Sequence, residues 1–311
     1  MKLILSKLLY IKFFQAPWSA AIRLWDNATG EYKHHCGGSI ITRNHILTAA
    51  HCLDQRILSK ISDTKSFKDD LQIILGMENP GLNCSQKESV TYQVEDFFIH
   101  PEFDFPYFDV ALIELTRKVE FTKGIASICL SRASSDDLTS HAVSLSGWGA
   151  TKQDGAPSNF LRSTNQLKVT PLGHCKNKIG IFTYDNPLYA SVFNRKEWLK
   201  TSDDGEQLSM EGLICIEDQD SNGLTGSCEG DSGSPVVEHA YFSHDGQRYE
   251  QVGIVSGGIC SDSHTPSVLT HIGHERVLEF IHNISKFTLL YLPTYLVDIV
   301  LNTMLFFYFS S

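Results

Sequence analysis

Residues 228–235 read Cys-Glu-Gly-Asp-Ser-Gly-Ser-Pro, so Ser232 follows an Asp and has a glycine nearby on each side. Glycine lets a backbone turn sharply, so the amide N–H groups of such a turn can point into one hollow. A hollow of this kind can hold an oxyanion and stabilise the charge that develops when a serine alkoxide attacks a carbonyl. Taken alone, the run is also typical of an ordinary turn.

A second run, Leu47-Thr48-Ala49-Ala50-His51-Cys52, supplies a base. A serine hydroxyl is a poor nucleophile until a neighbouring imidazole can take its proton. The chain has 13 histidines, and we expect most of them to be surface residues or satisfied core residues. The flanking motif separates His51 from the others.

A third run, Phe108-Asp109-Val110-Ala111-Leu112-Ile113-Glu114-Leu115, places a carboxylate at the mouth of an apolar strand. A buried Asp can fix the tautomer of a histidine and stabilise its imidazolium form. A single Asp in the turn before a strand is common, but three such motifs in the order His, Asp, Ser are not. Together they predict nucleophilic catalysis by Ser232 with His51 and Asp109.

The rest of the sequence predicts an all-β body. Short apolar or alternating runs, separated by turns that contain Gly, Pro, Asn or Asp, continue from about residue 17 to residue 283. Residues 53–70 and 176–212 are predicted loop insertions, and residues 274–282 have helical spacing. We therefore divide the chain into an unassigned segment 1–16, a body 17–285 and an apolar tail 286–311.

Composition restricts the partners and the compartment. The formal net charge of −10, without a Lys/Arg-rich run, argues against a nucleic-acid partner. Eight cysteines without a CxxC pair indicate an oxidising, extracellular compartment, and their spacing matches no zinc site, so no metal or other cofactor is expected. Sequons at Asn27, Asn83 and Asn283 are compatible with a secreted glycoprotein.

The apolar stretch 287–309 is long enough to cross a bilayer, which takes about 20 residues. It contains Pro293, Asp298 and Asn302, and an Asp is expensive in lipid. Three interpretations stay open: a membrane anchor, a hydrophobic appendage that packs on the body, or a spurious translated extension. A lipid-anchor signal is disfavoured because no polar spacer precedes the run.

The three motifs resemble those of the chymotrypsin/trypsin family, and the likeness runs from about Pro17-Trp18 to the closing helix. Cys36-Gly37-Gly38-Ser39-Ile40 and Gly147-Trp148-Gly149 add to it. The resemblance implies two antiparallel six-stranded β-barrels with a C-terminal helix, and a triad in the cleft between the barrels. It assigns Ser232 as the nucleophile, His51 as the general base and then acid, and Asp109 as the group that orients His51. The N–H groups of Gly230 and Ser232 would form the oxyanion hole.

The resemblance also implies a primary specificity pocket. Its floor falls on Gly226, which carries no charge, so cleavage after Lys or Arg is not expected. The small residues Ser227, Gly258 and Ser267 predict an open, mildly polar slot for apolar or aromatic side chains. Ser256, Gly257 and Gly258 would pair with the substrate backbone, with Gly257 in place of the usual Trp of the family.

Matching to the family suggests three disulfides: Cys36–Cys52, Cys175–Cys215 and Cys228–Cys260. Many members of the family have a fourth bridge. In this sequence Val143 and Glu238 occupy the positions of its two cysteines. Cys84 and Cys129 stay open: they pair with each other, Cys129 remains reduced, or its partner lies in a segment that this sequence lacks.

The start of the chain departs from the family pattern. Members are activated by a cut before an Ile-Val-Gly-Gly-type sequence, whose new amino group pairs with the Asp that corresponds to Asp231. Here the matching region reads Leu5-Ser6-Lys7-Leu8. A buried carboxylate without a counter-charge holds its site poorly.

Three explanations compete for this departure: a sequence that is incomplete relative to a longer zymogen, which we favour, an unusual activation route, or a protein without proteolytic activity. The predicted function is a serine endopeptidase that acts through an acyl-enzyme, with protein or peptide substrates, an activating protease and a protein inhibitor as partners. The alternatives are a non-catalytic, protease-like binding or regulatory protein and, more weakly, an adhesion module.

Overall fold

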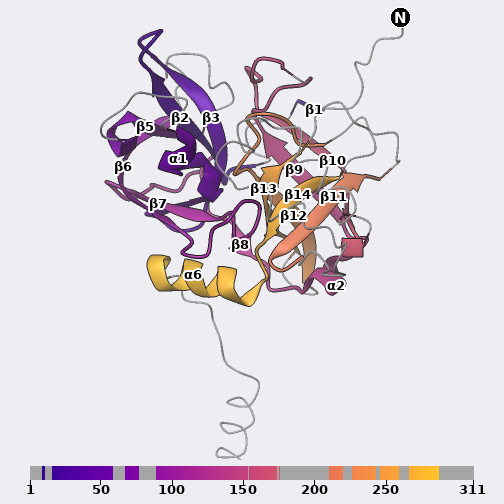
Figure 1. Ribbon diagram of the computed structural model, residues 1–311. Helices are drawn as coiled ribbons and strands as arrows, with labels where there is room; N and C mark the ends of the chain where they lie inside the picture. The colour runs from indigo at the N-terminus through magenta and orange to yellow at the C-terminus, as the bar shows by residue number, and fades with distance from the viewer. Residues whose placement is uncertain are drawn as a thin grey trace, which may run out of the picture.

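The computed structural model describes residues 9–10, 16–58, 67–76, 89–152, 154–173, 175, 210–219, 226–242, 246–258 and 266–286, and strands are the main regular structure in it. Two barrels lie side by side, with the helices at their margins (Figure 1). The apolar tail, Cys84, Cys260, residues 5–8 and most of the 176–212 insertion lie outside the described residues.

The first barrel is closed and consists of six antiparallel strands in the order β2-β3-β4-β7-β6-β5. In a strand with one face in the core, apolar residues alternate with polar ones. In β4, β5 and β7 nearly every residue is buried, so apolar residues there follow one another. Their bounds are Ser19–Asp26 (β2), Glu31–Ile40 (β3), His45–Thr48 (β4), Leu71–Leu75 (β5), Val90–Ile99 (β6) and Ala111–Leu115 (β7).

The second barrel closes through the pairing of β9 with both β10 and β12, in the order β9-β10-β11-β14-β13-β12. The short strands β1 and β8 add to its edges, on β10 and β13 respectively. The bounds are Leu9–Tyr10 (β1), Cys129–Leu130 (β8), Ala142–Gly147 (β9), Arg162–Thr170 (β10), Leu213–Asp218 (β11), Pro235–Phe242 (β12), Gly246–Gly257 (β13) and Ser267–His271 (β14). The prediction of two antiparallel six-stranded barrels is confirmed.

The register of the second barrel supports one detail of the sequence comparison. Val143 of β9 and Glu238 of β12 are direct cross-strand partners. These are the two positions at which the sequence lacks a disulfide that many relatives have. Glu238 instead pairs with the Nδ1 atom of His141 at 2.6 Å.

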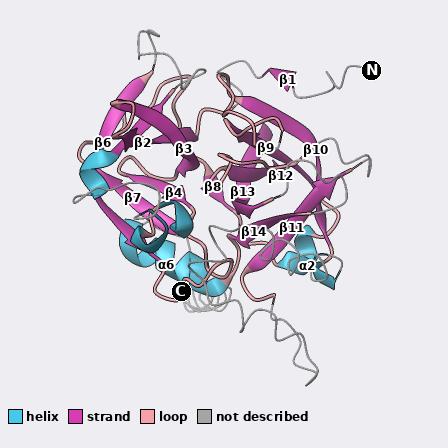
Figure 2. Ribbon diagram, turned by 45° about the horizontal axis from the view of Figure 1, so that its top comes forward, coloured by secondary structure: helices cyan, strands magenta, loops and turns pink. Residues whose placement is uncertain are grey.

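Few helices are present among the described residues, and the longest of these closes the body. The helical turns are η2 (Ala50–Cys52), α1 (Gln55–Leu58), η3 (Phe67–Asp70), α2 (Ser135–Leu138) and α6 (Glu275–Ser285). Helix α6 starts one residue after His274, ends at Lys286 in the left-handed region, and buries Val277, Phe280 and Ile281. It starts one residue later than the predicted 274–282, runs three residues further, and lies beneath the first barrel (Figures 1 and 2). None of the helices in the described residues is long and apolar enough to span a bilayer.

Polar contacts join the two barrels across their interface. The Ser39 hydroxyl of β3 donates to Oε1 of Gln251 in β13 at 2.7 Å, and both side chains are fully buried. The Gly37 N–H donates to the carbonyl oxygen of Ser232 at 2.7 Å. A buried polar group is retained at low cost only when it is hydrogen-bonded, so these contacts fix the alignment of the barrels at the predicted site.

Candidate active site

Asp109 and His51 form a buried, directly hydrogen-bonded pair. Asp109 follows the Phe108 turn ahead of β7 and is 0% exposed, while His51 lies on η2 and is 4% exposed. Oδ2 of Asp109 is 2.6 Å from Nδ1 of His51, and Oδ1 accepts the His51 backbone N–H at 2.8 Å. This arrangement places the proton on Nδ1, so Nε2, which has Sγ of Cys52 3.8 Å away, is the ring atom that can act as a base.

Two further donors fix the aspartate. The Ser256 hydroxyl donates to Oδ2 of Asp109 at 2.5 Å, and the Thr270 hydroxyl donates to the Asp109 carbonyl oxygen at 2.9 Å. Both donors come from the second barrel, whereas His51 comes from the first. The carboxylate is therefore held at the barrel interface by charge-assisted hydrogen bonds, which are shorter and stronger than neutral ones.

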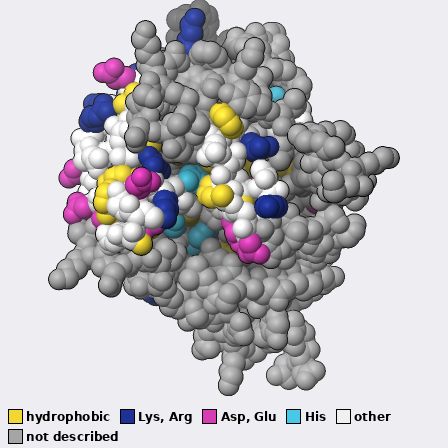
Figure 3. Space-filling model, turned by 90° about the horizontal axis from the view of Figure 1, so that it is seen from above, with side chains coloured by type: hydrophobic (Ala, Val, Ile, Leu, Met, Phe, Trp, Pro, Cys, Tyr) yellow, Lys and Arg dark blue, Asp and Glu magenta, His cyan; other side chains and the backbone are white. Residues whose placement is uncertain are grey.

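Packing fixes the imidazole on its other sides. The Cys36–Cys52 disulfide ties η2 to β3, next to His51 in the chain. The Phe105 ring meets the His51 ring edge-on, with the ring centroids 5.7 Å apart. When the molecule is seen from above, histidine side chains are visible near the centre of the surface (Figure 3).

Ser232 lies on a loop that bonds to one strand of each barrel, β3 and β13. Its carbonyl oxygen accepts the Gly37 N–H of β3, and the next residue, Gly233, donates its N–H to the Val255 carbonyl oxygen at 2.8 Å. Gly233 has φ +81°, and a Cβ there would clash with the Thr48 side chain, so only glycine fits. The structure thus brings Ser232 to the same interface as the other two motif residues.

A half-buried histidine, His34, binds a carbonyl of the loop that carries the expected oxyanion donors. Nε2 of His34 is 2.9 Å from the Gly230 carbonyl oxygen, while Nδ1 is buried without a hydrogen-bond partner among the described residues. Burial lowers the pKa of His34 to about 4, so the ring is neutral near pH 7 and donates from Nε2. Because His34 binds the Gly230 carbonyl, that peptide is held in one orientation; Gly230 itself has φ +92°.

Asp231 is buried beneath the loop without a cationic partner among the described residues. Its Oδ1 accepts the Gly149 N–H at 2.8 Å and its Oδ2 accepts the Cys228 N–H at 3.0 Å. Burial raises its pKa to about 6, although both N–H donors act in the opposite direction. A Cβ on Gly147 or Gly149 would clash with this carboxylate, which explains why the Gly147-Trp148-Gly149 motif needs its two glycines.

The predicted pocket residues lie together, but the slot between them is closed. The Ser227 hydroxyl donates to the Ser267 hydroxyl oxygen at 2.9 Å, and the two side chains are 2% and 4% exposed. A Cβ on Gly258 would come within 3.0 Å of the Ser267 hydroxyl oxygen and closer still to that of Ser227. The expected open slot is therefore not present between these residues, because Gly258 rests directly on the serine pair. Gly226 lies next to them, with Ser267 Oγ 3.7 Å from its Cβ position.

Ser256 and Gly257 end β13, and their surroundings only partly match the prediction. The Ser256 hydroxyl donates a hydrogen bond to Asp109, while Gly257 pairs with Val268 of β14 after a register shift. Their role in pairing with a substrate stays a prediction.

Two of the three suggested disulfides are present: Cys36–Cys52 and Cys175–Cys215. Cys228 is also disulfide-bonded, and its suggested partner Cys260 lies outside the described residues. The potential ligand atoms of Cys36, His51 and Cys52 lie within 4.8 Å of one another. Those two sulfurs are joined to each other, however, and metal ions bind the thiolate, so this group does not fit a metal.

Comparison with known proteins agrees with this geometry. A family model described as Trypsin matches residues 12–281. Testisin of Homo sapiens is 27% identical over 261 residues, which are 83% of this chain and 71% of testisin. Serine protease filzig of Drosophila melanogaster is 28% identical over 255 residues, 81% of this chain and 13% of filzig. Transmembrane protease serine 11G of Rattus norvegicus is 28% identical over 264 residues, 84% of this chain and 51% of the relative.

Proposed function

Because the chain belongs to the trypsin family of serine endopeptidases, we propose that His51, Asp109 and Ser232 are its catalytic triad, within a peptidase domain that spans residues 17–285. The observation that carries the proposal is the buried 2.6 Å contact between Nδ1 of His51 and Oδ2 of Asp109. It fixes the tautomer that a general base for Ser232 requires.

The proposed reaction proceeds through an acyl-enzyme. Oγ of Ser232 attacks the carbonyl carbon of the scissile peptide while Nε2 of His51 takes the hydroxyl proton. The Asp109 carboxylate stabilises the imidazolium, and the N–H groups of Gly230 and Ser232 stabilise the oxyanion. The C–N bond then breaks as His51 returns the proton to the leaving amine. Water, activated by the same histidine, releases the acyl group and restores Ser232.

For substrate preference, we propose cleavage after apolar or aromatic residues and not after Lys or Arg. The described pocket residues Gly226, Ser227, Gly258 and Ser267 carry no carboxylate that could neutralise a cationic side chain. A bound side chain must first separate Gly258 from the serine pair, since the slot is closed in this structure. Part of the binding free energy is then spent on opening the pocket, which raises the apparent Kd.

The proposed setting is extracellular, with membrane association through residues 287–309 as a further proposal. The disulfides Cys36–Cys52 and Cys175–Cys215 support an oxidising compartment. Protein substrates follow from the family, and we propose an activating protease and a protein inhibitor as further partners.

The test is hydrolysis by the purified, disulfide-bonded full chain of peptides that differ only in the residue before the cut bond. We expect cleavage after Phe or Leu, little after Lys or Arg, and none by Ser232→Ala. Preferential cleavage after Lys or Arg would contradict the pocket assignment. Hydrolysis that persists in Ser232→Ala would contradict the triad. No cleavage of any peptide would favour a non-catalytic binding protein.

A further inference from the structure

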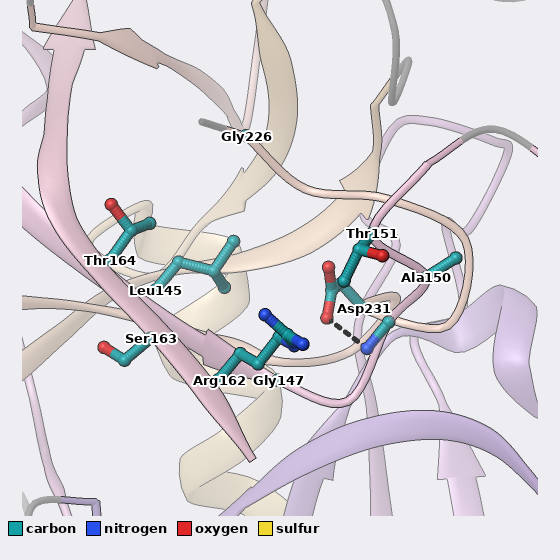
Figure 4. Close-up of a pocket in the computed structure, with 10 residues that line it drawn as sticks. Leu145, Gly147, Ala150, Thr151, Arg162, Ser163, Thr164, Gly226 and Asp231 are labelled. Atoms are coloured by element: carbon teal, nitrogen blue, oxygen red, sulfur yellow. Dashed lines mark hydrogen bonds between the residues drawn. The ribbon is translucent and has the colours of Figure 1, made fainter. Parts of the chain in front are cut away.

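A cavity of about 40 Å³ lies beside Asp231. This is several times the roughly 10–15 Å³ that one water-sized probe occupies. Its described lining comes from β9, the start of β10 and the loops at 149–151 and 226–231. Only two of these lining residues are charged: Asp231 and Arg162 (Figure 4).

Arg162 is close to Asp231 through the sheet. It is the first residue of β10 and the cross-strand partner of Gly147, whose Cβ position lies against the Asp231 carboxylate. Directly opposite residues of an antiparallel pair have their Cα atoms about 5 Å apart. The long side chain of Arg162 extends into the cavity, with Asp231 across it (Figure 4).

The guanidinium of Arg162 is held only weakly where it lies. Its Nε donates to the hydroxyl oxygen of Ser158 at 3.0 Å, and this neutral contact is its one side-chain hydrogen bond in the described structure. A carboxylate is a stronger acceptor for a guanidinium, because it binds the planar fork with two charge-assisted bonds. Ser158 in turn donates its N–H to the Trp148 carbonyl oxygen at 2.8 Å, so it belongs to the same segment that encloses Asp231.

Among the residues that the structure describes, no cation pairs with Asp231, although a buried carboxylate needs a counter-charge. Burial raises its pKa to about 6, and its two acceptor bonds are to backbone N–H groups of no net charge. Asp231 lies between Gly230 and Ser232, so a shift of its carboxylate moves both expected oxyanion donors. Whatever neutralises Asp231 therefore controls the geometry of the oxyanion hole.

We propose that Arg162 is a positioning residue that rotates from Ser158 to Asp231 and supplies its counter-charge from within the chain. The ion pair fills the cavity, fixes the 230–232 backbone and supports the oxyanion hole without requiring a new amino terminus. The inference rests on the proposed serine endopeptidase function for its catalytic consequence. Its structural part, the ion pair, does not depend on that function.

The catalytic consequence is tested by the rate at which a fluorophosphonate labels Ser232 in the uncut full chain. Arg162→Gln is compared with Arg162→Lys and with Lys168→Gln, which removes a cation from the same strand. We expect labelling to slow by about ten-fold or more in Arg162→Gln, as the loss of a hydrogen bond to a charged group implies. Arg162→Lys should keep most of the rate, and Lys168→Gln all of it. Equal rates for Arg162→Gln and wild type would overturn the inference.

The ion pair itself is tested by a thermal-unfolding cycle of Arg162→Gln, Asp231→Asn and the double variant at pH 7.5. Pairing predicts that Arg162→Gln lowers the melting temperature in the wild-type background and not in the Asp231→Asn background. Additive changes would overturn the inference, whatever the labelling shows. If Arg162→Gln does not fold, the same cycle is run with Arg162→Met, which also removes the charge. A wild type that never labels would remove the proposed function, while the cycle still decides the pairing.

Discussion

His34→Gln tests whether a neutral, half-buried histidine supports the loop that carries Gly230. The Gln side chain can place its amide N–H near the position of Nε2 and so keep a donor for the Gly230 carbonyl oxygen, 2.9 Å away in the wild type. It removes the titration of the imidazole, however. The substitution therefore separates the hydrogen bond from the pH dependence.

The magnitude follows from the pKa. Burial lowers the pKa of His34 from 6.5 to about 4, so the unfolded chain binds more protons than the folded one between these values. The free energy of unfolding therefore falls as the pH drops from 6.5 to 4 and is fully retained above 6.5. At about 1.4 kcal/mol per pH unit, the total loss from His34 is at most about 3 kcal/mol. His35, with a pKa also lowered to about 4 by burial, adds a comparable loss.

The assay is denaturant unfolding, followed by tryptophan fluorescence, of wild type, His34→Gln, His35→Gln and the double variant from pH 7.5 to pH 4. Each single variant should lose about 3 kcal/mol less than wild type over this range, and the double variant should lose less still. A difference between wild type and His34→Gln that stays constant with pH would refute the reasoning. Such a result would mean that the ring is not buried as a neutral group.

Three further predictions concern the triad, the Asp231 cradle and the disulfide. Asp109→Asn should lower kcat by roughly 10⁴-fold while the chain still folds, because an amide N–H facing Nδ1 favours the wrong tautomer of His51; a fall of less than about ten-fold in peptide hydrolysis would count against it. Gly149→Ala should lower the free energy of unfolding by about 3 kcal/mol or more, because its methyl displaces the Asp231 carboxylate from two hydrogen bonds; an unchanged denaturation midpoint would contradict this. Cys36→Ser should cost about 3 kcal/mol for a loop with a sequence separation of 16, measured in the same way, and a loss below about 1 kcal/mol would show that the bridge does not stabilise the first barrel.

The all-β body and the three motif residues could be predicted because their signals are local, whereas the two-barrel arrangement followed from the resemblance to the trypsin family. Alternating strands and short turns identify a β-structure, and the motifs around His51, Asp109 and Ser232 identify themselves by their immediate neighbours. The closing helix was also predictable, although its end at Ser285 was not. Helix ends depend on the capping geometry, here the left-handed Lys286.

The residues that the sequence did not reveal act through contacts across the fold. His34 has no motif of its own and matters only because folding brings it to Gly230, 196 positions later in the chain. The closed pocket depends on how Gly258 packs against the Ser227 and Ser267 pair, and residue size alone predicted space there. The position of Arg162 opposite Gly147 follows from the strand register, which local patterns do not specify.

The central claim, that Ser232 is the nucleophile of a serine endopeptidase, is tested most directly by covalent labelling. The disulfide-bonded full chain is treated with a fluorophosphonate, digested and mapped by mass spectrometry. We predict one phosphonylated residue, Ser232, with labelling lost in His51→Ala and in protein unfolded before treatment. Labelling at another serine, or none at Ser232 in the folded chain, would contradict the account.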